Sequence, residues 1–252
     1  MAAKYTGKYT KAFLSDKKIK KESLEYDFFN NKISVQENEM ACIFSFKGNK
    51  LLFCKGYDKF LGIPEEEMDL LRLNSIFTEF YEKFIYELHD RVLLFLYNNN
   101  TDLESFSSHI ITHVEGIEAP VMIVMKVYST DDNGNLVSII GRNYIDKNLI
   151  TSDVVQYAFH GDFNPEFKNK IDNDLDFTSC ISYTNLRVLE ALETGKKMAE
   201  ISTMMNIEES QLNINIQKLL KRFELKDESE LIEFAKAKKL IPNQFDNYLK
   251  KN

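Results

Sequence analysis

The chain has 252 residues, of which 44% are hydrophobic and 12% aromatic. That length suits one large domain or two ordinary ones, and that composition excludes a largely disordered protein. The formal net charge of -7 argues against a general nucleic-acid binder. Its distribution is uneven, because residues 181–252 carry 12 Lys+Arg and 11 Asp+Glu, a net charge of +1, which leaves -8 for the first 180 residues. A near-neutral C-terminal part is compatible with DNA binding, since a short helix can expose its few basic groups together.

Cysteine usage and the N-terminal residues indicate the compartment. The chain's 3 cysteines have no C-x-x-C spacing and no histidine cluster beside them, and we expect them to be core side chains in a reducing environment. The first residues lack the apolar core of a signal peptide, and no apolar run approaches the length of a membrane span. We therefore expect a cytoplasmic protein with no membrane partner.

Composition divides the chain into four zones. Residues 1–34 are polar and lysine-rich and predict an N-terminal helical segment. Residues 35–150 contain strand-like runs, residues 151–180 are typical of a linker in which Asp and Asn dominate and Gly161 and Pro165 interrupt the chain, and residues 181–252 follow a helical pattern throughout. The run KKIKK at residues 17–21 is interpreted as a solvated helix face, with a phosphate-contacting arm as the alternative.

The second zone predicts an α+β fold with an antiparallel sheet. Two strands are joined by the turn KGNK, short helical pieces and one long helix follow, and three more strands come last. Asn74 or Ser75 is the expected N-cap of the long helix. The turn DDNGN is a strong hairpin signal, because Asn133 and Gly134 tolerate positive φ. The predicted strands are residues 41–46, 51–54, 107–114, 119–129 and 136–145.

Residues 35–150 resemble a PAS domain. The resemblance is carried by FSFKGNKLLFCKGYDKFLGIPEEE, which is similar to the family's opening hairpin and helix entry, and by VYSTDDNGNLVSIIGRNYID, which is similar to its closing hairpin. Some other α+β sensor-like fold is the alternative. The resemblance implies a sensory and dimerising module, and it does not specify the signal.

No cofactor, metal or catalytic residue is predicted for this module. The flavin-binding branch of the family uses a cysteine in an N-C-R-F-L-Q run after the second strand, whereas Cys54 precedes the helices. Haem would need an axial ligand such as His89, but a lone helical histidine is more often a surface or core residue. His109 and His113 lie on a predicted strand, where their spacing is too wide for a metal pair.

From Ile181 onward, caps and apolar stripes predict four helices. Ser182 is the expected N-cap of the first helix and Gly195 ends it, a short helix follows, and a tight turn at Asn206 and Ile207 leads into a longer helix. Asp227 with a glutamate three residues later predicts a capping box for the last helix. Two middle helices joined by a tight turn indicate a helix-turn-helix.

The third of these helices has two different faces. At roughly 100° per residue, one face carries the apolar stripe that should be buried. Amides on the opposite face can read adenine, lysines can meet guanine or phosphate, and an exposed isoleucine can touch thymine methyl groups. An ordinary solvated face is the alternative, and it would more often show Glu/Lys pairs. The buried stripe is Leu212, Ile216, Leu219, Leu220 and Phe223, the predicted DNA-binding face is Ser210, Gln211, Ile214, Gln217, Lys218 and Lys221, and Lys196, Lys197, Asn213 and Arg222 lie at its margins.

Residues 182–235 resemble the LuxR-type helix-turn-helix family. The segment SYTNLRVLEALETGKKMAEISTMMNIEESQLNINIQKLLKRFELKDESELIEFA follows the family pattern without gaps. It departs where Asn213 replaces a lysine and Asn215 replaces a histidine. The resemblance implies that helix 208–223 enters the major groove and that the last helix pairs two copies.

These patterns favour a cytoplasmic transcription regulator that binds DNA as a homodimer, with a PAS-like sensor controlling an all-α four-helix DNA-binding domain. The expected partners are double-stranded DNA, a second copy of the chain, and a small-molecule or protein signal at the PAS-like domain. The alternative is a protein-interaction adaptor with weakened DNA binding, which the acidic total and Asn213 support. An enzyme is poorly supported, since no Walker loop, nucleophile elbow, metal set or kinase signature is present.

Overall fold

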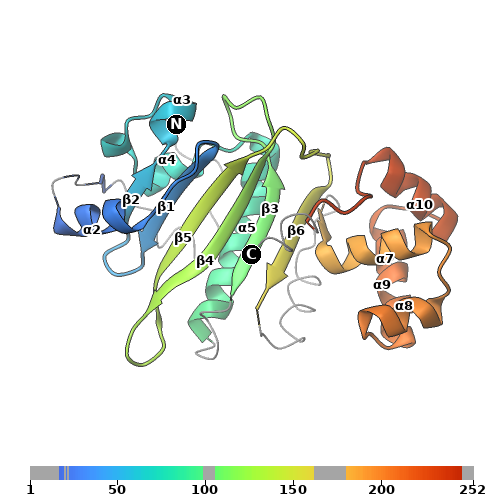
Figure 1. Ribbon diagram of the computed structural model, residues 1–252. Helices are drawn as coiled ribbons and strands as arrows, with labels where there is room; N and C mark the ends of the chain where they lie inside the picture. The colour runs from blue at the N-terminus through green and yellow to red at the C-terminus, as the bar shows by residue number, and fades with distance from the viewer. Residues whose placement is uncertain (1–16, 20, 22, 99–105, 162–179, 246–252) are drawn as a thin grey trace. The chain divides into compact units, whose positions relative to one another are not determined.

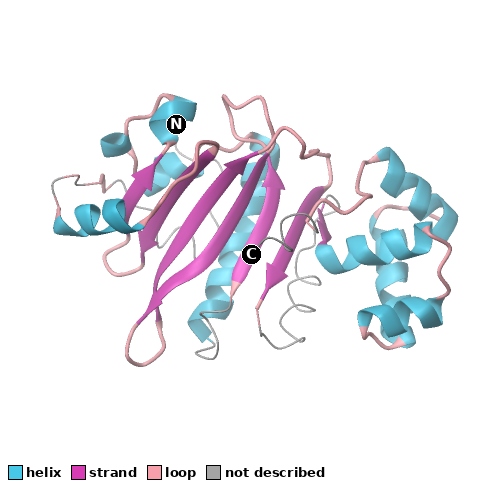
Figure 2. Cartoon of the chain, in the orientation of Figure 1, coloured by secondary structure: helices cyan, strands magenta, loops and turns pink. Residues whose placement is uncertain are grey.

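The computed structural model shows two compact units (Figures 1 and 2). Unit 1 comprises residues 1–149 and 159–175, and unit 2 comprises residues 150–158 and 176–252. The start of the predicted N-terminal segment and most of the predicted linker lie outside the described residues. The structure describes residues 17–19, 21, 23–98, 106–161 and 180–245.

Unit 1 is built on an antiparallel sheet. Its strands follow the order β2-β1-β5-β4-β3, and each adjacent pair is antiparallel. The five strands predicted from the sequence are all present, which confirms the α+β class of this part. Their bounds are β1 Glu39–Ser45, β2 Lys50–Lys55, β3 Ser107–Thr112, β4 Val121–Thr130 and β5 Leu136–Ile145.

Of the helices that the structure describes in unit 1, one precedes β1 in chain order, and the others lie in the connection from β2 to β3. Figure 1 shows the longest of them, α5, running along one face of the sheet. Their bounds are α2 Leu24–Lys32, α3 Tyr57–Leu61, the 3-10 turn η1 Glu65–Glu67, α4 Leu70–Asn74 and α5 Glu79–Asn98.

The predicted start of the long helix is wrong. Asn74 is the last residue of α4 and Ser75 is its C-cap, whereas α5 begins only at Glu79. The reason is tertiary, because Phe77 forms an isolated antiparallel bridge with Val114 and so belongs to an extended segment. Local cap chemistry does not reveal such a bridge.

Two tight turns connect the hairpins of this sheet. Gly48 and Asn49 both have positive φ in the turn after β1, at 91° and 47°. In the DDNGN turn the positive φ falls on Gly134 and not on Asn133. Asp131 Oδ1 instead accepts hydrogen bonds from the backbone N–H groups of Asn133 and Asn135, both at 2.9 Å. The turn is therefore closed by an aspartate side chain as well as by glycine.

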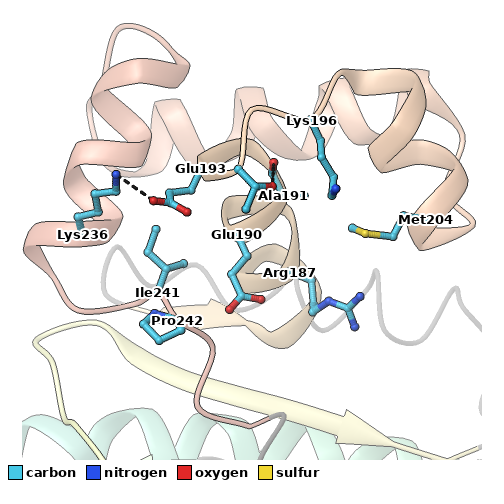
Figure 3. Close-up of a pocket in the computed structure, with 10 residues that line it drawn as sticks. Arg187, Glu190, Ala191, Glu193, Lys196, Met204, Lys236, Ile241 and Pro242 are labelled. Atoms are coloured by element: carbon cyan, nitrogen blue, oxygen red, sulfur yellow. Dashed lines mark hydrogen bonds and ion pairs between the residues drawn. The ribbon is translucent and has the colours of Figure 1, made fainter.

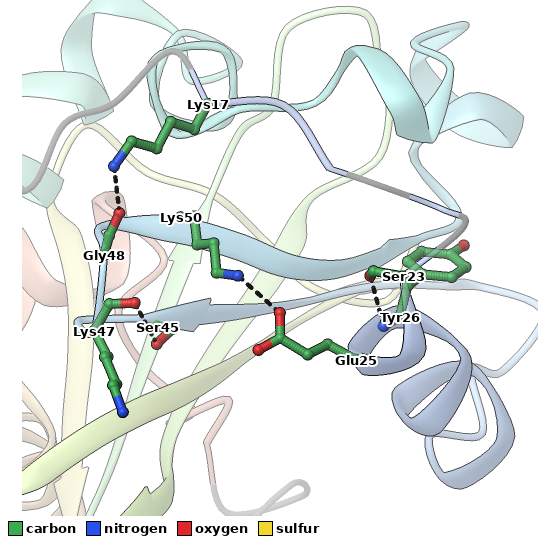
Figure 4. A network of polar contacts seen from close by, with 8 residues as sticks. All are labelled: Lys17, Ser23, Glu25, Tyr26, Ser45, Lys47, Gly48 and Lys50. Carbon is green, nitrogen blue, oxygen red and sulfur yellow. Dashed lines mark hydrogen bonds and ion pairs between the residues drawn. The ribbon is translucent and has the colours of Figure 1, made fainter.

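Helix α2 is attached to the first hairpin (Figure 4). Ser23 caps it by accepting the Tyr26 N–H, and Lys50 pairs with Glu25 at 2.7 Å. Lys17 donates to the carbonyl of Gly48 at 2.8 Å. Residues 17–19 have no helical structure, so the interpretation of the KKIKK run as a helix face is wrong for them.

The core of unit 1 contains buried polar groups that are paired within the chain. Asn143 Nδ2 donates to Tyr57 Oη at 2.9 Å, and both residues are buried. Cys42 and Cys54 lie opposite each other on β1 and β2, and burial raises the pKa of the Cys54 thiol. All 3 cysteines are buried, as expected for core side chains, and none forms a disulfide among the described residues.

A buried histidine lies on β3. His109 is 4% exposed, its Nε2 is 3.3 Å from Ser107 Oγ, and its ring packs edge-on against that of His160 with centroids 4.8 Å apart. Burial, followed by the nearby charges of His160 and Lys126, lowers the pKa of His109 to about 3. The folded protein therefore holds this imidazole neutral at ordinary pH.

We expect His109 to make stability depend on pH. An unfolded histidine has a pKa of about 6.5, so below that value the unfolded chain binds a proton that the folded chain refuses until about pH 3. Stability should fall as pH is lowered through this window, by at most about 1.4 kcal/mol per pH unit. Urea denaturation at about pH 7 and pH 5 should show a smaller loss for His109→Leu than for the wild type. Equal losses in the two proteins would show that His109 does not carry the effect.

The described part of unit 2 contains a short strand pair and four helices. The first four residues of β6 Val155–His160 belong to this unit, and β6 pairs in parallel with β7 Cys180–Ser182 through residues 155–157 and 180–182. Sequence reasoning did not predict these strands, because the polar residues that follow β6 dominated the composition of the predicted linker. The helices are α7 Tyr183–Glu193, α8 Met198–Met205, α9 Glu209–Arg222 and α10 Glu228–Ala237.

Candidate nucleic-acid interface

The ends of the four helices are set by the residues that the sequence singled out. Ser182 caps α7 by accepting the Asn185 N–H, and Gly195 follows the helix with φ 74°. Asn206 ends α8 in the left-handed conformation with φ 53°, so only Ile207 and Glu208 separate it from α9. This tight turn between α8 and α9 confirms the predicted helix-turn-helix.

The predicted capping box of α10 is half formed. Asp227 Oδ1 accepts the Glu230 N–H at 3.0 Å, as a capping aspartate should. The Glu230 carboxylate accepts the N–H of Lys226, one residue before the cap, at 2.8 Å. Both hydrogen bonds stabilise the start of α10, which packs against α7 and α9.

The apolar stripe of α9 faces the core of unit 2. Leu212, Ile216, Leu219 and Leu220 are all buried, which confirms four of the five predicted positions. Phe223 is half-buried and stacks on Phe234 of α10, with ring centroids 4.5 Å apart. The stripe fixes the rotation of α9 about its axis, and thereby determines which side chains remain exposed.

The opposite face of α9 is open to solvent. Ile214 is 48% exposed and is the one large hydrophobic side chain of α9 among the exposed large hydrophobics of the described residues. Gln211 is half-buried at the edge of this face. One helix therefore brings together all six side chains of the predicted face, and their contact with DNA stays a prediction. The exposed members are Ser210, Ile214, Gln217, Lys218 and Lys221.

One hydrogen bond on this face was not foreseen. Gln211 Nε2 donates to Asn215 Oδ1 at 2.9 Å, one helical turn further along. Asn215 is half-buried and was not among the predicted site residues. Its spacing of four residues from Gln211 is the signal that could have identified it, because side chains at i and i+4 of a helix are neighbours.

The four marginal residues have different surroundings. Asn213 is exposed on α9, and Lys197 is exposed immediately before α8, where its backbone N–H donates to Glu200. Arg222 is half-buried, and its guanidinium donates to the backbone carbonyl of Cys180 at 3.2 Å. That bond gives Arg222 a structural role within unit 2, in addition to any contact with DNA.

Lys196 lies in the wall of a cavity of about 700 Å³ (Figure 3). The cavity is lined by residues of α7, α8 and α10 and by the segment after α10. Arg187 of α7 and Met204 of α8 are among the lining residues. Lys236 and Glu193 form an ion pair at 3.0 Å in its wall. Among the described residues that line it none belongs to α9, so the cavity is separate from the exposed face of that helix.

Charge is distributed unevenly along α9. Glu208 is its N-cap and Glu209 lies in its first turn, where the helix dipole favours an acidic group. Lys221 and Arg222 lie in its last turn, where the dipole favours cations. The last turn would therefore attract a phosphate backbone and the first turn would repel it.

Comparisons with known proteins identify no family for this chain. No protein-family model and no curated protein sequence matches the chain. Similar solved structures include a phage VqmA bound to DPO, with 13% identity, 86% of each chain covered and a TM-score of 0.31. A Vibrio cholerae VqmA–ligand–DNA complex has 13% identity over 82% of this chain and 85% of the other, with a TM-score of 0.31. A Vibrio cholerae VqmA dimer without target DNA, described with LuxR-type receptors, has 14% identity over 86% and 89%, with a TM-score of 0.33. At this level of similarity, no residue of this chain is assigned a role from a residue of these structures.

The described residues contain no group of three or more His, Cys, Asp or Glu side chains arranged to hold a metal ion. No helix among them is long and apolar enough to cross a membrane. The side chain of His89, the alternative haem ligand, lies outside the described part of α5.

Proposed function

We propose that this chain is a DNA-binding transcription regulator that inserts α9 into the major groove. One observation carries the proposal: α9 is the second helix of a tight helix-turn-helix, and opposite its buried stripe it exposes amide, hydroxyl, lysine and isoleucine side chains. The major groove is about 12 Å wide and admits one α-helix. In this pose Gln211 reads adenine and Lys221 meets a phosphate.

A genome-wide binding profile of the tagged protein tests this proposal. The regulator should occupy discrete sites that share one sequence motif, because base contacts add specificity to the phosphate contacts. A profile without such sites would favour the adaptor. That alternative is supported by Glu208 and Glu209 at the start of α9, which repel phosphates, and by the cavity between α7, α8 and α10, which is open to a protein partner.

The proposed regulator acts as a homodimer, because one helix contacts few base pairs and useful specificity needs two half-sites. Helix α2 offers a surface for a second copy. Leu24 and Phe28, one turn apart on its outer face, are 88% and 49% exposed. Glu25, on the flank of that face, already pairs with Lys50 at 2.7 Å, so the contact between two α2 helices is expected to rest on Leu24 and Phe28.

We expect light scattering to show a dimer of the full chain at tens of micromolar. Replacing both Leu24 and Phe28 by Ser should yield a monomer, since the apolar contact is lost. Leu71→Ser is the matched control, because Leu71 is also an exposed leucine of unit 1, at 41%, but lies on α4. A monomeric wild type, or a double variant that stays dimeric, would contradict the assignment of α2.

Unit 1 supplies the input of the proposed regulator, and its signal is a small molecule or a protein. Two buried hydroxyl groups, Tyr86 Oη and Ser108 Oγ, have no hydrogen-bond partner among the described residues. An unpaired buried hydroxyl costs about 1–3 kcal/mol, so a molecule that hydrogen-bonds to these groups would stabilise unit 1.

A further inference from the structure

The hydrogen bond between Gln211 and Asn215 points to a residue that sets specificity. We propose that Asn215 is a positioning residue, which holds the Gln211 amide in the orientation that reads adenine and disfavours guanine. This inference rests on the proposed function, since it requires α9 to lie in the major groove. It assigns a role to a position at which the LuxR-type pattern has histidine and this chain has asparagine.

Geometry supports a fixed orientation of Gln211. Its Nε2 is 2.9 Å from Asn215 Oδ1, and both residues are half-buried at the edge of the exposed face. A free glutamine side chain has three rotatable bonds and loses considerable entropy when it binds. The bond to Asn215 removes part of that freedom before DNA is bound, so less is lost on binding.

The direction of the bond determines what Gln211 offers to a base. Because Asn215 contributes its carbonyl oxygen, the NH₂ group of Gln211 is turned towards Asn215, and Gln211 Oε1 remains available as an acceptor. Adenine presents the N7 acceptor and the N6 donor in the major groove, so it pairs with Oε1 and the amide proton beside it. The second amide proton can stay on Asn215 throughout.

Guanine requires a different orientation of the same amide. It presents only acceptors, N7 and O6, to the major groove. A mobile glutamine can rotate its NH₂ group towards guanine, whereas a glutamine held by Asn215 would place Oε1 against an acceptor. Asn215 should therefore affect the choice between adenine and guanine more than it affects affinity.

The test is competitive selection from a pool of random-sequence duplexes with the full chain. The base pair read by Gln211 is identified as the position whose preference disappears in Gln211→Ala. At that position, Asn215→Ala should lower the preference for adenine over guanine about threefold, because an i, i+4 amide pair shifts side-chain populations about twofold and is strengthened where water is excluded. Preferences at all other positions should be unchanged.

Two further variants separate positioning from a structural role. Asn215→Asp keeps an acceptor for Gln211, so it should retain the adenine preference while weakening binding to all sequences through its charge. In the Gln211→Ala background, Asn215→Ala should have no further effect on base preference. Thermal unfolding of each variant monitors the fold of unit 2.

The possible failures are distinguishable. If the wild type enriches a motif with a Gln211-dependent position that Asn215→Ala leaves unchanged, or if Asn215→Ala changes all positions alike, the positioning role is wrong and the proposed function stands. If the wild type enriches a motif in which no position depends on Gln211, the positioning role of Asn215 is likewise wrong and the proposed function stands. If the wild type enriches no motif, the proposed function fails and this inference fails with it.

Discussion

Replacing Gln211 by Ala is expected to weaken binding to the preferred duplex by about 1–3 kcal/mol, or about 5- to 150-fold, and to have little effect on a scrambled duplex. The reason is that paired amide contacts to a base edge discriminate between sequences, whereas a truncated side chain offers no such contact. Gln211 is suited to this role by its place at the edge of the exposed face of α9 and by its bond to Asn215. Titrations against both duplexes measure the difference.

Lys221→Ala is the matched control for this prediction. Lys221 is exposed in the last turn of the same helix, and its ammonium has charge but little base-reading geometry. Its loss should weaken binding to both duplexes similarly and flatten the salt dependence by about one unit per protomer. If both variants weakened the two duplexes equally, α9 would contribute charge without sequence readout.

Gly56→Ala is expected to destabilise unit 1 by about 3 kcal/mol or more. Gly56 has φ 89°, and a Cβ at this position would lie 2.5 Å from the carbonyl oxygen of Glu39. Backbone strain and a clash with backbone atoms of β1 therefore act together. Because Gly56 connects β2 to α3, the change would also disturb the hairpin that holds α2.

Gly48→Ala provides the comparison for Gly56→Ala. Gly48 has a similar φ of 91°, but a Cβ there would have nothing within 4 Å. This variant should show the cost of backbone strain alone, about 1 kcal/mol. Urea denaturation monitored by circular dichroism measures both, and equal losses of stability would mean that the close approach of Gly56 to Glu39 does not matter.

The sequence predicts much of the fold because the relevant signals are local. The strands of unit 1 alternate or form short apolar runs between turn residues, and Ser182, Asn206 and Asp227 set helix ends through contacts within a few residues. The errors arise where contacts are distant. Phe77 and Val114 are 37 positions apart in the sequence, and the bridge between them delays the start of α5 to Glu79.

In the candidate site, too, the features set by local sequence are predicted and those set by distant contacts are not. Helical periodicity is sufficient to predict which face of α9 is buried, and Leu212 and Ile216 confirm it. It does not reveal that Arg222 reaches the carbonyl of Cys180, or that Lys196 lines a cavity, because these depend on how other elements pack. Asn215 is intermediate, since its spacing from Gln211 is visible in the sequence but the direction of their bond is not.

The most direct test of the account is the binding of the full-length chain to duplex DNA at several salt concentrations. A regulator that inserts α9 into the major groove should bind a selected duplex more tightly than a scrambled one, with an affinity for both that falls as salt is raised. Lys221→Ala should flatten that fall, and Gln211→Ala should reduce the gap between the two duplexes. The absence of any salt-dependent duplex binding by the wild type would contradict the account and leave the protein-interaction adaptor in its place.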